Sequence, residues 1–291
     1  MDAPAEHPAQ LRSVAETLAA DAAGFVRRRR AEVFGAGAGT AASEAVRTKT
    51  TPTDPVTVVD TETERFLRDR LARIRSGDPI LGEEGGGPTE PAASAEVVTW
   101  VLDPIDGTVN FLYDIPAYAV SVAAQIDGVS VAGAVADVVG ARVYSAGTGL
   151  GAHVTDQRGT RPLRCSAVTD LSMALLGTGF GYSRGRREAQ AALLARMLPA
   201  VRDVRRIGSA ALDLCMVAAG RLDAFYEHGL QVWDCAAGAL VAAEAGARVL
   251  LPEPGPGSGG AELVVAAAPG IADQLLAALQ RCGGRAAIRE Q

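Results

Sequence analysis

The pattern of apolar positions near the N-terminus predicts two helices separated by a loop. Apolar side chains recur at helical spacing over 11–33, so this stretch is expected to form an amphipathic helix. Residues 35–52 are rich in Gly, Ala, Ser and Thr, which is typical of a flexible loop. Thr61 and Glu64 then form a capping-box pattern, which predicts a second helix that reaches about Arg75.

Short apolar runs bounded by turn residues predict strands in the rest of the first half. The expected strands or extended segments cover 56–59, 79–82, 97–102, 117–126, 129–138 and a strand pair within 141–156. Asp127 and Gly128 alone separate the two longest runs, which is a strong signal for a β-hairpin. The first half is therefore predicted to pack helices on an antiparallel sheet.

The second half alternates between strand and helix patterns. The expected strands are 172–178, 204–207, 224–226, 247–250 and 263–267. The expected helices are 186–198, 210–219, 234–245 and 271–280. A Pro- and Gly-rich stretch at 252–260 is expected to be a loop. Such alternation predicts an α/β half with a mixed sheet.

Length, composition and charge narrow the class of protein. A chain of 291 residues is long enough for one large domain or two closely packed halves with a sizeable core. Its 48% hydrophobic content excludes disorder, and its net charge of −6 argues against nucleic acid or anionic lipid as a main partner. The four-arginine run 27–30 is therefore expected to be a solvated helix turn. Lys49 is the one lysine, and its surroundings lack the glycine-rich pattern of a Walker A nucleotide site.

Targeting signals and metal-binding cysteines are missing from the sequence. No apolar run is long enough to cross a membrane, and the N-terminus lacks the regions of a signal peptide. The four cysteines are not clustered and only three histidines occur, so neither a zinc site nor a disulfide framework is expected. We therefore expect a cytoplasmic protein without a membrane or nucleic-acid partner.

The segment WVLDPIDGTVNF, residues 100–111, carries the most informative chemistry. A buried strand is expected to end at Asp103, because Pro104 has no N–H group with which to continue the ladder. Asp106 follows and Gly107 allows a sharp turn, so two carboxylates are presented where a strand gives way to a loop. Two such acids repel one another unless a cation lies between them, and oxygen ligands favour Mg²⁺ or Ca²⁺. A turn with aspartate side-chain hydrogen bonds explains the segment equally well when it is taken alone.

Further acids lie at the ends of other apolar runs. They are Asp54, Asp60, Glu83, Glu84 and Asp234. Each one taken alone is explained at least as well by a helix N-cap, a role that suits Asp60 and Asp234. The whole set is harder to explain in that way, because side chains at strand ends can converge on one edge of a core. The sequence therefore favours an oxygen-ligand metal site.

Four blocks make the sequence resemble the inositol monophosphatase family over nearly its whole length, especially its bacterial SuhB-type members from actinobacteria. The blocks are Lys49 with DPVTVVD (54–60), GEEGG (82–86), WVLDPIDGTVNF (100–111), and IGSAALDL (207–214) with QVWDCAAGA (231–239). The resemblance implies an α/β fold, α+β in the first half and α/β in the second, layered in the order αβαβα. Residues 1–160 would form an N-terminal half with most metal ligands. Residues 161–291 would form a C-terminal half with Asp234 and the substrate contacts, and the two would make one compact phosphatase unit.

The resemblance also implies roles for individual residues. The implied metal ligands are Glu83, Asp103, the Ile105 carbonyl, Asp106 and Asp234, which would hold two to three Mg²⁺ ions. The implied catalytic residues are Glu83, Thr108 and Asp60, with Thr108 orienting the attacking water. The implied substrate contacts are Asp106, Gly107, Thr108, Gly208, Ser209, Ala210, Glu227 and Asp234. A homodimer, inhibition by Li⁺ and a positioning role for Lys49 are further implications.

The expected reaction is Mg²⁺-dependent hydrolysis of inositol monophosphate to inositol and phosphate by a metal-activated water. Glu227 favours a polyol hydroxyl over a second phosphate, because its charge would repel an anion. No arginine cluster is evident near Glu227, although Arg184 and 205–206 could reach it. Histidinol phosphate or another sugar or polyol phosphate is the main alternative substrate, and a non-catalytic binding protein of the same fold is a further alternative.

Two covalent mechanisms are disfavoured by the residues themselves. Cys215 and Arg221 have the spacing of a cysteine phosphatase, but Cys215 lies on an apolar helix stripe and is expected to be core. Asp103 and Asp106 are separated by two residues, whereas an aspartyl-phosphate mechanism usually has two Asp separated by one. Among neighbours of the acids, Trp100 and Trp233 are expected to be core and His228 to face solvent.

Overall fold

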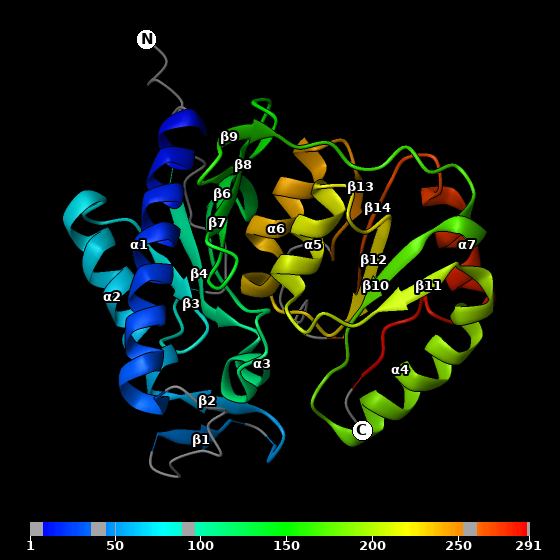
Figure 1. The fold of residues 1–291 in the computed structure, drawn as a ribbon, viewed down its shortest axis with the longest axis horizontal. Coiled ribbons are helices and arrows are strands. Elements are labelled where there is room, and N and C mark those ends of the chain that lie inside the picture. The colour runs from blue at the N-terminus through cyan, green and yellow to red at the C-terminus, as the bar shows by residue number, and fades with distance from the viewer. Residues whose placement is uncertain (1–7, 36–44, 50, 89–96, 253–260, 290–291) are drawn as a thin grey trace.

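The computed structural model describes residues 8–35, 45–49, 51–88, 97–252 and 261–289. Figure 1 shows five layers that alternate between helix and sheet across the molecule. The helices are α1 (Pro8–Phe34), α2 (Val58–Ile74), α3 (Thr108–Tyr113), α4 (Arg184–Met197), α5 (Ala210–Ala218), α6 (Val232–Glu244) and α7 (Ala272–Arg281). Within the described part of the chain, no helix is both long and apolar enough to cross a membrane.

The larger sheet belongs to the first half of the chain. Its strands, in spatial order, are β3 (Ile80–Gly82), β4 (Val98–Asp106), β5 (Ala119–Ile126), β6 (Val129–Asp137), β7 (Arg142–Gly147), β8 (Ala152–Asp156) and β9 (Gly159–Pro162). The predicted hairpin is confirmed as β5 and β6, joined by Asp127 and Gly128, which both have positive φ. The sheet is antiparallel as predicted, except that β3 runs parallel to β4.

A bulge in β4 decides where two of the acids point. Asp103 pairs with Ser121 of β5 and Asp106 pairs with Ala119, so three residue steps on β4 span two on β5. Residues an odd number apart on a regular strand face opposite sides, but the extra residue turns both aspartates to one face. The prediction that the strand ends at Asp103 is therefore wrong. The strand continues past Pro104, whose missing N–H is accommodated in the bulge.

The smaller sheet belongs to the second half and is mixed, as predicted. Its order is β11 (Asp203–Arg205), β10 (Leu175–Thr178), β12 (Ala224–His228), β14 (Leu263–Ala267) and β13 (Arg248–Leu250). β10 runs parallel to both of its neighbours, whereas β14 is antiparallel to β12 and β13. The predicted strand over 172–178 starts later than expected, because 171–173 form a 3₁₀ turn.

Three apolar cores hold the layers together and confirm the predicted αβαβα order. In the first core, α1 and α2 cover the outer face of the larger sheet, with Leu18 and Leu67 fully buried there. In the second core, α5 and α6 lie between the two sheets, as Figure 1 shows, and Leu214 and Val241 are buried there in one cluster with residues of both sheets. In the third, α4 and α7 cover the outer face of the smaller sheet. The C-terminal end of β4 thereby comes to face the start of α6.

The N-terminus of α2 differs from the prediction. The helix begins at Val58, and Thr57 caps it in a capping box with Asp60 rather than Thr61 with Glu64. Residues 58 and 59, expected to be extended, are therefore helical. Ahead of this cap, β1 (Val46–Thr48) lies inside the expected loop and pairs antiparallel with β2 (Pro55–Thr57), so the first part of the segment 56–59 is extended as expected. Residues 36–44 and 50 of that loop, and 253–260 of the later one, lie outside the described residues.

Candidate active site

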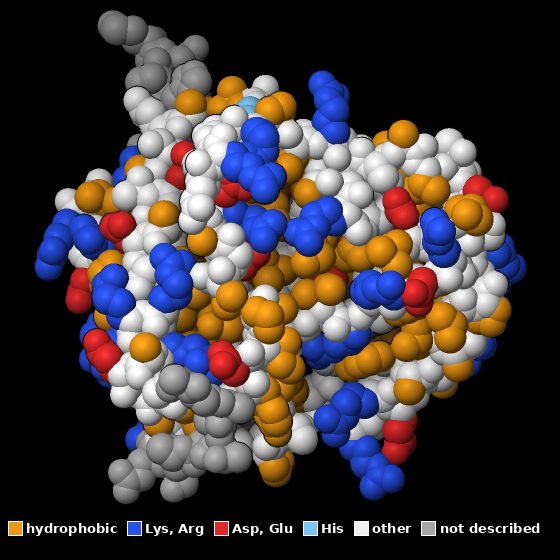
Figure 2. Space-filling model, in the orientation of Figure 1, with side chains coloured by type: hydrophobic (Ala, Val, Ile, Leu, Met, Phe, Trp, Pro, Cys, Tyr) orange, Lys and Arg blue, Asp and Glu red, His pale blue; other side chains and the backbone are white. Residues whose placement is uncertain are grey.

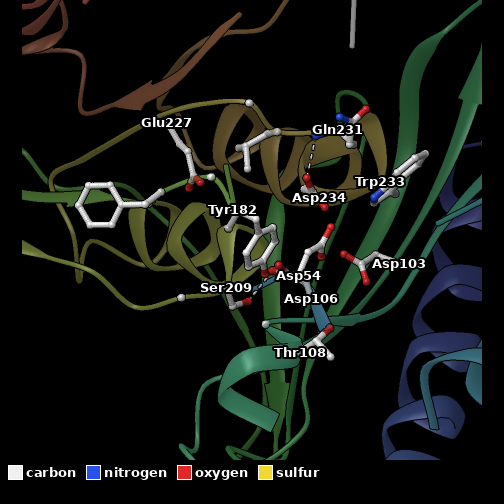
Figure 3. A pocket seen from close by; sticks show the side chains of 18 of the residues that line it. Asp54, Asp103, Asp106, Thr108, Tyr182, Ser209, Glu227, Gln231, Trp233 and Asp234 are labelled. Carbon is white, nitrogen blue, oxygen red and sulfur yellow. Dashed lines mark hydrogen bonds between the residues drawn. The ribbon is translucent and has the colours of Figure 1, made fainter. Parts of the chain in front are cut away.

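Three aspartates from the two halves of the chain converge at the C-terminal end of β4. Asp103 and Asp106 project from the bulge, and Asp234 projects from the first turn of α6. One carboxylate oxygen of each lies within 4.8 Å of the others. Figure 3 shows the three side chains pointing toward a common region, with Glu227 on the far side of Tyr182. Oxygen ligands gathered in this way match the preference of Mg²⁺ or Ca²⁺.

The protein holds each aspartate by hydrogen bonds to one of its oxygens. The bonds run from Ile105 N to Asp103 Oδ1 at 3.0 Å, from Ser209 Oγ and Ala211 N to Asp106 Oδ2 at 2.5 and 2.7 Å, and from Gln231 N to Asp234 Oδ2 at 2.7 Å. Such support fixes the carboxylate planes and leaves the other oxygen of each group available as a ligand. Supporting bonds of this kind orient metal ligands in proteins.

The electrostatics of the cluster call for a positive charge. Burial raises the pKa of Asp106 to about 6, and it raises the pKa values of Asp103 and Asp234 well above the usual range. The negative charge of Glu83 is the next cause for Asp103 and Asp234. A divalent cation would reverse this repulsion and keep the acids ionised. The residues therefore fit a metal ion.

The loop that carries Glu83 is held by a buried acid on α2. Glu64 Oε2 accepts a hydrogen bond from Glu84 N at 2.7 Å, and Glu64 Oε1 accepts one from Gly85 N at 2.9 Å. A Cβ on Gly82 would lie 2.3 Å from Glu64 Oε1, so only glycine fits against that carboxylate. Lys49 Nζ lies 2.7 Å from Glu83 Oε1 and 2.5 Å from Glu84 Oε1. Glu83 is thus presented by a rigid loop with a lysine beside it.

Asp60 and Thr108 form a buried pair beside the cluster. Asp60 Oδ2 accepts hydrogen bonds from Thr57 N and Oγ1, at 2.9 and 2.5 Å, which completes the cap of α2. Asp60 Oδ1 lies 3.1 Å from Thr108 Oγ1, and that hydroxyl is also 3.1 Å from the Ile105 carbonyl oxygen. Burial raises the pKa of Asp60 to about 7. The pair can therefore hold a proton and orient a neighbouring water.

Two glycines allow the loops around the cluster to approach closely. Gly107 and Gly208 both have φ of +97°, which few other residues adopt. A Cβ on Gly107 would lie 3.0 Å from the carbonyl oxygens of Ala117 and Gly208. The approach brings the start of α3 next to the start of α5, where backbone N–H groups favour an anion such as phosphate.

Glu227 forms the opposite end of the site. It lies on β12 against Gly179, where a Cβ would come within 1.9 Å of its carboxylate. Burial raises the pKa of Glu227 to about 8, and the positive charge of Arg206 partly opposes this. Arg186 and Arg206 line the cavity, whereas Arg184 is exposed in an ion pair with Glu188. Of the arginines expected to reach Glu227, only Arg206 does so. Arg184 and Arg205 lie outside the cavity in exposed ion pairs, and Arg186, which was not expected there, acts on Glu227 instead.

A single cavity of about 740 Å³ joins the cluster to Glu227. The predicted site residues that line it are Glu83, Asp103, Ile105, Asp106, Gly107, Thr108, Gly208, Ser209, Ala210, Glu227 and Asp234. Asp60 is not among them, because it is buried behind Thr108. The roles assigned to these residues stay predictions, although the structure places them together.

Several lining or supporting residues were missed by the sequence analysis. They include Glu64, Tyr182, Arg186, Asp213 and Gln231. The signal for Asp213 was present, because it is an acid between two leucines on a stripe expected to be core. Glu64 was misread as part of a cap, so its long-range contact to the loop after β3 was not foreseen.

The expectations for neighbouring residues have mixed outcomes. Trp100 and Cys215 are fully buried in the core, as predicted. Trp233 is partly buried and packs against the core between the sheets, but it also lines the cavity, so the prediction that it is core is confirmed only in part. His228 was expected to face solvent, but it is 1% exposed and its Nε2 lies 3.0 Å from the Gly284 carbonyl. The run 27–30 is not a freely solvated turn, because Arg30 is buried and bonded to the Phe111 carbonyl.

Comparison with known proteins agrees with the geometry. A model of the inositol monophosphatase family matches residues 7–284. The chain is 74% identical to the inositol-1-monophosphatase of Mycobacterium leprae, over 99% of both chains. It is 71% identical to the inositol-1-monophosphatase SuhB of Mycobacterium tuberculosis, over 98% of both chains. The solved structure of Mycobacterium tuberculosis SuhB matches with a TM-score of 0.81 and 67% identity, over 96% of this chain and 99% of that one.

Proposed function

This chain belongs to the inositol monophosphatase family and is a phosphoric monoester hydrolase, and from that premise we propose that it hydrolyses an inositol monophosphate with Mg²⁺. The family is metal-dependent and acts on small phosphate esters. The observation that carries the proposal is the acidic cluster facing Glu227 across one cavity. One end of that cavity suits a metal-bound phosphate and the other suits a neutral, hydroxyl-rich group.

The proposed metal ligands are four carboxylate side chains and one backbone carbonyl. Glu83, Asp103 and the Ile105 carbonyl would hold one Mg²⁺, and Asp103, Asp106 and Asp234 a second, with a third held weakly near Glu83. Bound divalent ions would lower the pKa of water and stabilise the charge of the leaving oxygen. Lys49 neutralises Glu83 and Glu84 next to this position, so its ammonium group would be replaced or shifted as the ions bind.

The chain's own groups would position the reactants. Thr108 and Glu83 would orient the attacking water, and Asp60 would keep the Thr108 hydroxyl in place through their 3.1 Å contact. Backbone N–H groups of Gly107 and Thr108 would bind the phosphate oxygens. Holding the water and the phosphorus atom in one geometry removes the entropic cost of bringing them together.

The polyol ring would lie toward the second half of the chain. Gly208, Ser209 and Ala210 would contact its hydroxyls, with Asp106 and Asp234 near the phosphate-bearing carbon. Glu227 would bind a hydroxyl at the far end, where its raised pKa lets it donate as well as accept. Arg186 and Arg206 lie near Glu227 and would repel the cationic group of histidinol. Their charge therefore favours a polyol phosphate over histidinol phosphate as the substrate.

Phosphate release from a small panel tests this proposal. The panel is myo-inositol 1-phosphate, histidinol phosphate, fructose 1,6-bisphosphate and adenosine 3′,5′-bisphosphate, each with Mg²⁺ and with a chelator. We expect Mg²⁺-dependent turnover led by the inositol phosphate. Turnover led by another compound would overturn the substrate assignment and keep the metal mechanism. Folded protein without any turnover would favour the non-catalytic binding protein.

Further expectations from the family likeness are part of the proposal. They are a homodimer, inhibition by Li⁺ at the position held by Asp103, Asp106 and Asp234, a cytoplasmic location, and halves 1–160 and 161–291 that act as one unit. Figure 2 shows apolar side chains gathered over the region of α3, where Tyr113 is 68% exposed and Ile115 46%. This surface supports a dimer, which sedimentation of the purified protein would test.

A further inference from the structure

One buried acid in the cavity is not used by the proposed mechanism. Asp213 lies in the first turn of α5 between two buried leucines and is only 1% exposed. Its Oδ1 atom is shielded from solvent and has no hydrogen-bond partner among the described residues. Buried polar atoms in folded proteins are nearly always paired, so an unpaired one in a cavity wall points to a partner that binds there.

The backbone of β10 makes room for this acid beside Glu227. A Cβ on Gly177 would lie 3.0 Å from Asp213 Oδ1, and a Cβ on Gly179 would lie 1.9 Å from Glu227 Oε2. Gly177 lies in β10 and Gly179 directly follows its last residue, and the Cβ positions of the two glycines point at Asp213 and Glu227 respectively. The two carboxyl groups therefore stand over neighbouring positions of one strand, and both line the cavity.

We propose that Asp213 is a second hydroxyl-binding residue, which acts with Glu227 to select a polyol carrying neighbouring hydroxyl groups. The inference rests on the proposed function and deepens it by naming the pair of acids that recognises the substrate. Figure 3 shows that Glu227 stands apart from the three aspartates, so the polyol end is separate from the metal end. With Asp213, the polyol would be held at this end by two carboxyl groups rather than by one.

The chemistry of the pair suits a hydroxyl group better than an anion. Burial raises the pKa of Asp213 well above its usual range, and the neighbouring Glu227 charge raises it further. A protonated carboxyl both donates and accepts a hydrogen bond, as a hydroxyl does. A site whose buried polar groups need a hydroxyl partner discriminates strongly against analogues that lack it, because those groups are then left unpaired.

Steady-state kinetics on two substrates tests the inference. Asp213→Ala, Asp213→Asn and wild type are compared on myo-inositol 1-phosphate and on p-nitrophenyl phosphate, which has no hydroxyls, at saturating Mg²⁺. For Asp213→Ala we expect KM for the inositol phosphate to rise roughly tenfold, with kcat little changed. Activity on p-nitrophenyl phosphate should stay within about threefold, and Asp213→Asn should restore most of the inositol phosphate KM because the amide still donates and accepts. Cys215→Ala is the matched control, because Cys215 is buried on the same helix but outside the cavity. It should leave kcat and KM for both substrates unchanged.

Three outcomes would overturn the inference. An equal loss on both substrates would make Asp213 a structural residue, and an unchanged KM would show that it does not contact the polyol. If circular dichroism shows that Asp213→Ala does not fold, Asp213→Leu is measured instead, because leucine fills the space without forming hydrogen bonds. A wild-type KM in Asp213→Leu would also refute the role. Wild-type enzyme that does not turn over the inositol phosphate would instead refute the proposed function, which is a separate result.

Discussion

Changing Glu64 to Gln tests whether a buried acid on α2 supports the loop that carries Glu83. Glu64 is 2% exposed, and its two oxygens accept hydrogen bonds from Glu84 N, Gly85 N and the Arg68 guanidinium. Every one of these partners is a donor. A glutamine keeps one acceptor oxygen and places its NH₂ group against the remaining backbone N–H, so one donor loses its partner.

The size of the effect follows from these contacts. When the glutamine oxygen takes the Oε1 position, it keeps Gly85 N and Arg68, and the bond to Glu84 N is lost. A hydrogen bond to a buried charged group contributes about 1.5–3 kcal/mol. The Arg68 ion pair adds little, because the Arg68 side chain is 30% exposed and such pairs contribute at most about 1 kcal/mol. We therefore expect the free energy of unfolding to fall by roughly 1.5–4 kcal/mol.

Two measurements check this prediction. Urea unfolding of the metal-free protein gives the stability change, and a Mg²⁺ titration of phosphate release gives the effect on the site. Half-saturation should need about tenfold more Mg²⁺, because groups that orient metal ligands typically change affinity by that factor or more. Glu62→Gln is the matched control, since Glu62 lies on the same helix in a partly exposed pair with Arg29. A loss below about 1 kcal/mol, or an unchanged Mg²⁺ requirement, would refute the reasoning.

Other predictions concern the reaction and its pH dependence. Asp106→Asn should lower kcat/KM by about a thousandfold or more. Circular dichroism should show an intact fold, because the amide oxygen still accepts hydrogen bonds from Ser209 and Ala211. An active variant would contradict the metal assignment. Thr108→Ala should lower kcat by about a hundredfold with little change in KM, whereas Thr108→Ser keeps the hydroxyl and most of the rate; equal loss in both variants would argue against a role for that hydroxyl. Burial raises the pKa of Glu227 from 4.5 to about 8, so the folded state binds more protons than the unfolded state between these values, and the free energy of unfolding falls as pH rises through this range. Glu227→Gln should show a weaker fall in urea unfolding over about pH 5–9, and the same slope as wild type would contradict the shift.

Most elements of the fold could be predicted because their signals are local. The hairpin of β5 and β6 is specified by two alternating runs and by Asp127 with Gly128. The alternation of helix and strand in the second half likewise predicted its mixed sheet. The start of α2 was misplaced, because Thr57 with Asp60 and Thr61 with Glu64 have the same spacing and only packing chooses between them.

The sequence by itself determined which acids gather at strand and helix ends, and family motifs gave their expected roles. Only the tertiary structure decided how they face one another. Asp103 and Asp106 share a face because the bulge in β4 changes the register against β5, which the local sequence does not specify. Asp213 stood out in the sequence as an acid between two leucines, but its place in the site, like that of Glu64, was decided by the tertiary structure, since each meets its neighbours across many residues of chain. Long-range packing and strand register determine such contacts, and neither produces a periodic pattern in the sequence from which they could be predicted.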